Sequence, residues 1–124
     1  MKWAKLVVAA SLLASAGAAV ADDSMSADEL KAYVVGKSYT GVNPSSGEEI
    51  ATVIYNADGS SVLSFPDGRE EPGSYRLDGD AYCTRYAAFR DNSENCFRLV
   101  ALGDGRAQAY YTDGRTALIL KPAE

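Results

Sequence analysis

Five Asp-Gly dipeptides constrain the fold of this 124-residue chain more than any other feature. They are Asp58-Gly59, Asp67-Gly68, Asp78-Gly79, Asp104-Gly105 and Asp113-Gly114. Glycine adopts positive φ at no steric cost and aspartate tolerates it, so Asp-Gly favours the tight turn of a β-hairpin. With a further turn near residues 89–95, turns recur about every 9 to 13 residues. This spacing predicts an antiparallel sandwich or barrel of short strands.

The predicted fold is mainly β: an up-and-down antiparallel meander of about eight strands with one short N-terminal helix. The helix is expected over Ala27–Val35, because Ser26 and Glu29 form a capping box and Gly36 suits the C′ position. Pro66 and Pro72 are expected at strand margins. The expected strands are Lys37–Gly41, Glu49–Tyr55, Ser61–Phe65, Gly73–Leu77, Ala81–Tyr86, Cys96–Leu102, Ala107–Thr112 and Thr116–Leu120. Closure into a small barrel would remove exposed edges, and a strongly curved open sheet with the helix over one end is the alternative.

The first 21 residues have the three parts of a secretory signal peptide. A cationic start with Lys2 and Lys5 precedes an apolar stretch, and Ala19-Val20-Ala21 is a small-x-small cleavage site. The apolar run is shorter than the ~20 residues that a spanning helix needs, so no transmembrane anchor is expected after cleavage. Residues 22–124 are then a single disulfide-containing β domain, and the expected location is periplasmic or secreted.

Composition excludes several classes of function. Without Lys2 and Lys5 the chain holds ten basic and 17 acidic residues, a formal net charge of −7, which disfavours binding to nucleic acid or anionic lipid. The chain contains no histidine, so Ser-His and Cys-His catalysis and His-ligated zinc are excluded. No phosphate-binding glycine loop or calcium-loop spacing occurs in the sequence. We therefore expect no cofactor, no metal and no enzymatic activity.

Cys83 and Cys96 are the only cysteines, and an oxidising compartment favours a disulfide between them. If they face each other across a hairpin, Tyr82 faces Phe97 and Arg85 faces Glu94. One face of the hairpin then carries Cys83, Arg85, Cys96 and Arg98, and the other carries Tyr82, Thr84, Tyr86, Phe97 and Leu99. Since a sheet buries one face, we expect the aromatic face inside and the disulfide outside, with solvated arginines beside it.

Eight tyrosines and one loop are the candidate binding features. Inward tyrosines either fill a small barrel or line a ligand cleft, because they combine a flat apolar face with a polar tip. The candidate cleft residues are Tyr55, Tyr75, Tyr82, Tyr86 and Phe97. The loop between the cysteines is either an ordinary long hairpin loop or a contact site for a partner protein. Its candidate contact residues are Phe89, Arg90 and Asp91.

The order of several motifs resembles a proteobacterial family of small exported proteins that is classified as a domain of unknown function. The motifs are Gly36-Lys37-Ser38-Tyr39, Tyr55-Asn56-Ala57-Asp58-Gly59, Gly73-Ser74-Tyr75-Arg76 before Cys83, Cys96-Phe97-Arg98, and Tyr111-Thr112-Asp113-Gly114. The resemblance implies a fold and no catalytic residues. A looser resemblance extends to calycin-like β-barrels and to periplasmic lysozyme inhibitors, whose Ser-Gly-x-Arg-Tyr loop this sequence lacks.

These observations predict an exported, non-enzymatic binding or envelope-associated module. A calycin-like small-molecule carrier is one alternative, and it requires a solvent-reaching cavity of at least ~300 Å³. An inhibitor of a cell-envelope glycan-processing enzyme such as lysozyme is another, and it requires Phe89 to be exposed. An enzyme would require a pocket with two or more titratable groups of shifted pKa.

Overall fold

The structure is a computed structural model that describes residues 23–123. The predicted signal peptide, residues 1–21, lies outside this range. Within it, no helix has the length and apolar character needed to cross a bilayer.

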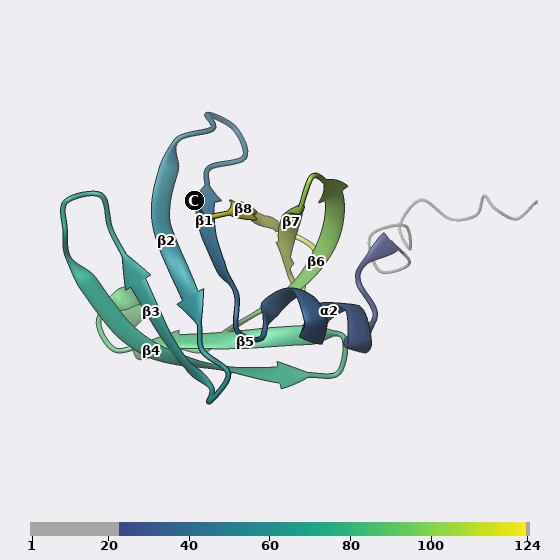
Figure 1. The fold of residues 1–124 in the computed structure, drawn as a ribbon, viewed down its shortest axis with the longest axis horizontal. Coiled ribbons are helices and arrows are strands. Elements are labelled where there is room, and N and C mark those ends of the chain that lie inside the picture. Colours follow the sequence, from purple (N-terminus) through teal and green to yellow (C-terminus); the bar gives the residue numbers. More distant parts are fainter. Residues whose placement is uncertain (1–22, 124) are drawn as a thin grey trace, which may run out of the picture.

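The described chain forms a closed, eight-stranded antiparallel barrel with one α-helix, α2 (Figure 1). Each strand pairs with the next, and β8 pairs back to β1, which closes the sheet. The predicted fold is thus confirmed, and the open curved sheet is wrong. The elements are α2 (Ala27–Val34), β1 (Ser38–Val42), β2 (Glu49–Tyr55), β3 (Ser60–Ser64), β4 (Glu70–Asp78), β5 (Ala81–Tyr86), the short 3-10 helix η3 (Phe89–Asn92), β6 (Asn95–Gly103), β7 (Arg106–Tyr111) and β8 (Thr116–Pro122).

Helix α2 closes one end of the barrel. Its capping box is present: the Glu29 backbone N–H donates to Ser26 Oγ at 3.2 Å, and the Ser26 N–H donates to Glu29 Oε1 at 2.8 Å. Leu30 and Val34 are fully buried and join Leu99 in the core. Helix α2 also packs against β5, and strands β5 and β6 pair through only three residue pairs. The segment just before the helix covers the part of β6 that β5 does not pair with: Ser24 pairs with Val100, and the Met25 N–H donates to the Leu99 carbonyl at 2.8 Å.

An up-and-down barrel places its connections alternately at two ends. The β2–β3, β4–β5 and β6–β7 turns lie at the α2 end, where the Tyr33 hydroxyl donates to the Gly105 carbonyl at 2.6 Å. The β1–β2, β3–β4, β5–β6 and β7–β8 connections lie at the opposite end, which α2 does not cover. We call this opposite end the mouth of the barrel.

The disulfide hairpin has most of the predicted register. Cys83 pairs with Cys96 in a disulfide, and Tyr82 pairs with Phe97, as expected. The expected Arg85–Glu94 pair is wrong, because the ladder ends at Thr84–Asn95, where the chain enters the loop that contains η3.

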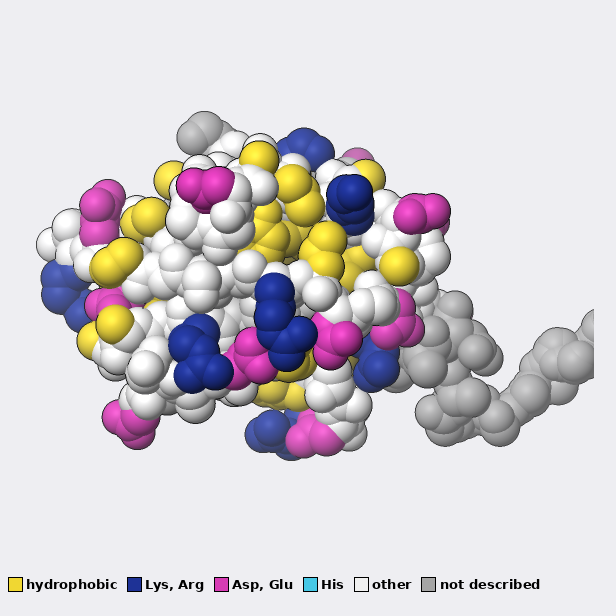
Figure 2. All heavy atoms as spheres, turned by 90° about the horizontal axis from the view of Figure 1, so that it is seen from below, with side chains coloured by type: hydrophobic (Ala, Val, Ile, Leu, Met, Phe, Trp, Pro, Cys, Tyr) yellow, Lys and Arg dark blue, Asp and Glu magenta, His cyan; other side chains and the backbone are white. Residues whose placement is uncertain are grey.

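Arg85 and Glu94, which do not pair with each other, each bind another residue. Glu94 accepts from Arg76 on β4 at 2.9 and 3.0 Å, and Arg85 Nη1 donates to the Asn92 carbonyl at 2.7 Å. Arg76 is the β4 partner of Cys83, so its bond to Glu94 lies beside the disulfide. Arg98 bonds Asp80 at 3.3 Å. Figure 2, seen from the side where β5 lies in Figure 1, shows acidic and basic side chains next to one another on this face.

The register gives a testable difference between the two faces of β5. Tyr82 is 2% exposed inside the barrel, whereas Arg85 is exposed outside it. We expect Tyr82→Ala to lower the free energy of unfolding by about 3–5 kcal/mol, because it leaves a large cavity in the core. Arg85→Ala should cost less than about 1 kcal/mol. Urea unfolding of both variants measures the difference, and equal losses would contradict the assigned faces.

Candidate functional site

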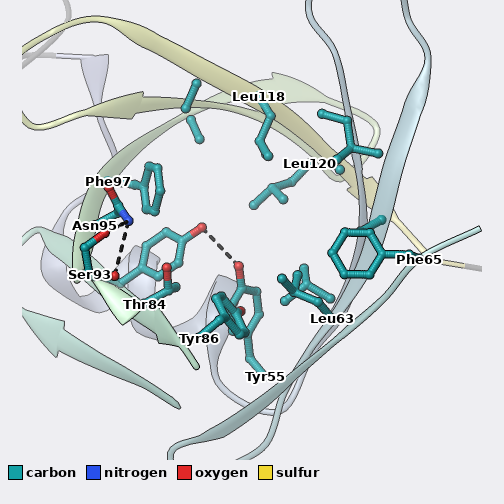
Figure 3. Close-up of a pocket in the computed structure, with 17 residues that line it drawn as sticks. Tyr55, Leu63, Phe65, Thr84, Tyr86, Ser93, Asn95, Phe97, Leu118 and Leu120 are labelled. Atoms are coloured by element: carbon teal, nitrogen blue, oxygen red, sulfur yellow. Dashed lines mark hydrogen bonds between the residues drawn. The ribbon is translucent and has the colours of Figure 1, made fainter. Parts of the chain in front are cut away.

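The interior of the barrel holds a cavity of about 160 Å³. Its lining comes from every strand except β4, together with Ser93 of the β5–β6 loop and Phe65, which follows β3 (Figure 3). Figure 3 shows these side chains arranged around an open centre. Ile50 at the start of β2 is 38% exposed, and Ser93 is also exposed, so the cavity reaches solvent at the mouth.

Small side chains create this space. Gly41, Ala51, Ala109 and Ala117 line the cavity on β1, β2, β7 and β8. They face the larger rings that β2, β5 and β6 direct inward. A barrel of eight strands is just wide enough for ordinary side chains to fill it, so this many small residues leave a hollow. None of these small residues is among the cleft residues predicted from the sequence, although small residues at alternate positions of the predicted strands were the available signal.

The cavity has a polar side and an apolar side. Tyr55 from β2 and Tyr82, Thr84 and Tyr86 from β5 bring hydroxyl groups to it. Leu118 and Leu120 lie across the cavity from these hydroxyls, and further aliphatic side chains complete the lining. The further aliphatic residues include Leu63 and Ala109. Of the described residues that line the cavity, none carries a charge.

The tyrosine hydroxyls form two buried pairs. The Tyr55 and Tyr82 oxygens lie 3.2 Å apart, and the Tyr86 oxygen lies 2.8 Å from Ser61 Oγ. The Tyr55 and Tyr82 rings meet edge to face, with centroids 5.6 Å apart. Tyr82 also packs on Phe97 with centroids at 5.6 Å. These contacts hold the rings in fixed positions around the cavity.

Four of the five candidate cleft residues lie together in this lining, and Tyr75 does not. Tyr55, Tyr82, Tyr86 and Phe97 all line the cavity. The Tyr75 hydroxyl instead donates to the Asn56 carbonyl at 2.6 Å, toward the α2 end, and its ring packs edge-on against Tyr55. Tyr75 therefore supports the position of Tyr55 without lining the cavity.

Two hairpins that share the pattern aromatic-x-Asp-Gly-Arg flank the mouth. Phe65-Pro66-Asp67-Gly68-Arg69 joins β3 to β4, and Tyr111-Thr112-Asp113-Gly114-Arg115 joins β7 to β8, on opposite sides of the barrel. In each, the arginine Nε donates to the aspartate at 2.8 Å. Its guanidinium lies over the aromatic ring, 4.6 Å from the Phe65 centroid and 4.5 Å from that of Tyr111. Each arginine is thus paired within its own turn.

The candidate partner loop is described only in part. Its backbone forms η3, and Asp91 is exposed with φ of 56°. The side chains of Phe89 and Arg90 lie outside the described part of the structure. Asn92 also has positive φ, at 61°, so two consecutive residues hold a conformation that few side chains favour.

One group of possible metal-ligand atoms occurs among residues 23–123. It consists of the Cys83 and Cys96 sulfurs and the Glu94 carboxylate, all within 4.8 Å of one another. The thiolate is the form of cysteine that binds metals, and these sulfurs are bonded to each other. The oxidised site therefore offers one carboxylate, which also accepts from Arg76.

Burial makes the cavity tyrosines hard to ionise. It raises the pKa of Tyr55 and Tyr82 well above the ordinary value of about 10, and neighbouring tyrosines add to the effect. Burial also raises the pKa of Tyr86. The neutral phenols are therefore favoured in the folded state, and this contribution to stability is present below pH ~10 and lost as the pH rises above it.

Alkaline titration tests this behaviour. We expect Tyr55 and Tyr82 to ionise only as the barrel unfolds above pH ~10, so part of the tyrosinate absorbance should appear together with the loss of β circular dichroism. The Tyr55→Phe/Tyr82→Phe variant should lack that part of the absorbance. Full ionisation of all tyrosines near their ordinary pKa, with the circular dichroism unchanged, would contradict the burial of these two rings.

Comparison of the chain with protein-family models, with curated proteins and with solved structures gave no match. The geometry of the barrel cavity is therefore the basis for a functional proposal.

Proposed function

We propose that this chain is an exported, non-enzymatic binding protein that takes a small apolar group into the mouth of its barrel. The cavity of about 160 Å³, lined mainly by aromatic and aliphatic side chains, is the observation that carries this function. Engineered protein cavities of about 150 Å³ with apolar linings bind benzene. The expected occupant thus has the size of one aromatic ring.

The volume of the cavity limits the size of the ligand that a carrier of this kind could enclose. The cavity volume of about 160 Å³ is about half of the ~300 Å³ that a carrier of drug-sized ligands requires. A whole calycin-type ligand would not be enclosed. A single-ring molecule, a short alkyl chain, or the end of a longer apolar molecule fits.

The chemistry of the lining favours binding over catalysis. An enzyme would require a pocket with two or more titratable groups of shifted pKa. The cavity meets this requirement through Tyr55, Tyr82 and Tyr86. Their pKa values move away from neutrality, whereas a general acid or base works best with a pKa near the operating pH. Neutral phenols remain good hydrogen-bond donors, which suits recognition of a ligand.

Export is supported by the disulfide. Cys83 and Cys96 are bonded, and disulfides persist in oxidising compartments outside the cytosol. A periplasmic or secreted location agrees with the predicted signal peptide, residues 1–21. The rival proposal of an inhibitor of a glycan-processing enzyme depends on Phe89, whose side chain lies outside the described residues.

A cavity-filling variant tests the function. Ala109 is 1% exposed and lines the cavity, so Ala109→Leu adds three carbons to the space that a ligand would occupy. We expect saturable binding of toluene to the wild type, measured by NMR titration, and at least tenfold weaker binding to Ala109→Leu. Gly41→Val should fill the same space from β1.

Ser74→Leu is the matched control, since Ser74 is exposed on β4 and does not line the cavity. Its toluene affinity should equal that of the wild type. Circular dichroism establishes that each variant is folded before binding is compared. If the wild type does not bind toluene or any other single-ring probe, the proposed function is wrong. Equal affinity in the wild type and both filled variants would place the ligand elsewhere.

A further inference from the structure

The buried tyrosine pair of the cavity has one hydroxyl proton that the bond between the two rings does not use. Tyr55 and Tyr82 are 3% and 2% exposed, and each hydroxyl carries one proton. The bond between them uses one of these protons. No described residue accepts the second one. A buried donor without an acceptor is costly, so this pair is suited to an acceptor that enters the cavity.

Thr84 adds a third hydroxyl to the same side. Thr84 lies two residues after Tyr82 on β5, so both side chains point inward, and Thr84 is 8% exposed. Its hydroxyl bonds to no described residue. Two further hydroxyls of the aromatic cluster have partners of their own, since Tyr86 pairs with Ser61 and Tyr75 donates to the Asn56 carbonyl.

The unsatisfied hydroxyls face the cavity rather than a solid core. Figure 3 shows the Tyr55 oxygen directed toward the open centre, with its hydrogen bond to the neighbouring ring beside the space. Leu118 and Leu120 lie across from it. A ligand in this position meets a hydroxyl cluster on one side and aliphatic carbon on the other.

We infer that the cavity recognises a small neutral aromatic molecule that carries one oxygen, such as a phenol or an aryl aldehyde. The oxygen accepts a hydrogen bond from the Tyr55–Tyr82 pair, and the ring packs against Phe97, Leu118 and Leu120. This inference rests on the proposed function and adds the chemical class of the ligand.

The charge of the site selects against anions. A carboxylate that enters a low-dielectric cavity loses its hydration and needs a cation in return. The described lining offers none. At the mouth, Arg69 and Arg115 are already paired with Asp67 and Asp113. An aromatic carboxylate should therefore bind more weakly than the aldehyde of the same shape.

A matched series of probes tests the inference on the wild-type protein. Toluene has no oxygen, p-cresol adds a hydroxyl, benzaldehyde offers a carbonyl, and benzoate carries a negative charge. We expect p-cresol and benzaldehyde to bind about tenfold more tightly than toluene, and benzoate at least tenfold more weakly than benzaldehyde, by NMR titration. A purely apolar cavity would give the reverse order for toluene and p-cresol, because the polar oxygen would lose its hydration without a partner.

The Tyr55→Phe/Tyr82→Phe variant identifies the groups responsible. Replacing both partners of a buried hydrogen bond by apolar groups of the same shape is close to neutral for stability, so the barrel should remain folded. We expect its p-cresol affinity to fall about tenfold relative to its toluene affinity. Tyr75→Phe removes a hydroxyl from the same aromatic cluster outside the cavity, and it should change neither affinity.

The outcomes distinguish a failure of the proposed function from a failure of the inference about the ligand's oxygen. If no probe binds, the proposed function fails. If toluene binds as tightly as p-cresol or more tightly, the function stands and the inference about oxygen is overturned. Equal loss of toluene and p-cresol in the double variant would show that the tyrosines act through packing, which also overturns it. Loss of p-cresol alone supports the inference.

Discussion

Gly73→Ala should destabilise the barrel by about 3 kcal/mol, because no space exists for one added carbon. Gly73 on β4 pairs with Tyr86 on β5. A Cβ atom at this position would lie 2.3 Å from the Tyr86 ring and 2.4 Å from the Arg85 carbonyl oxygen. The carbonyl belongs to the backbone of the paired strand, so it cannot move away without disturbing the ladder. A loss of this size is a large share of the 5–15 kcal/mol that is typical of a folded domain.

Gly41→Ala is the matched control for this substitution. Gly41 is also a strand glycine, but its added Cβ would lie 3.4 Å from the nearest atom, a methyl group of Leu118. We expect a change within about 0.5 kcal/mol, since this contact is ordinary and the cavity is adjacent. Urea unfolding of the oxidised proteins compares the two variants. Equal midpoints would show that the Tyr86 ring does not cover Gly73 as described.

Turn chemistry and side-chain alternation predict the number of strands and their approximate positions, because both are local properties of the sequence. Glu49–Tyr55 and Ala81–Tyr86 have the predicted bounds. The error at β4 has a specific cause: Pro72 was expected at a strand margin, but β4 begins at Glu70. The β4–β5 ladder starts at Gly73, so Pro72 belongs only to the β3–β4 ladder, which agrees with the tolerance of proline at sheet edges.

The shape and lining of the cavity depend on pairings between strands that are far apart in the sequence. The sequence therefore predicted the cavity less well than it predicted the strands. Tyr55 and Tyr75 both point inward at predicted strand positions, yet only Tyr55 lines the cavity. Their heights along the barrel depend on strand tilt and on the stagger between strands, which no local pattern specifies. The hollow likewise depends on the pairing of β1 with β8, which brings Gly41 close to Leu118. The predictable part of the site was its aromatic composition.

Removing the disulfide should also lower the stability of the barrel strongly. Cys83→Ala/Cys96→Ala is expected to lower the free energy of unfolding by about 3 kcal/mol, because the bond closes a short loop and restricts the unfolded chain. The cysteines are 13 residues apart, and Cys83 is 1% exposed. Urea unfolding of the oxidised wild type and the double variant measures the loss. An unchanged midpoint would contradict a stabilising role for the bond.

The disulfide should also affect the affinity of the cavity for a ligand, which a crosslink far from the cavity would not do. The loop that it closes contains Ser93 and Asn95, and both line the cavity near the mouth. We therefore expect toluene affinity to fall in the double variant under conditions where circular dichroism still shows a folded barrel. Arg76→Ala is the control: it removes the exposed ion pair with Glu94 beside the sulfurs and leaves the loop closed. Because exposed ion pairs contribute at most about 1 kcal/mol, it should change neither stability nor affinity by a comparable amount. If Arg76→Ala matched the double variant in both, the ion pair and not the covalent bond would hold the mouth in place.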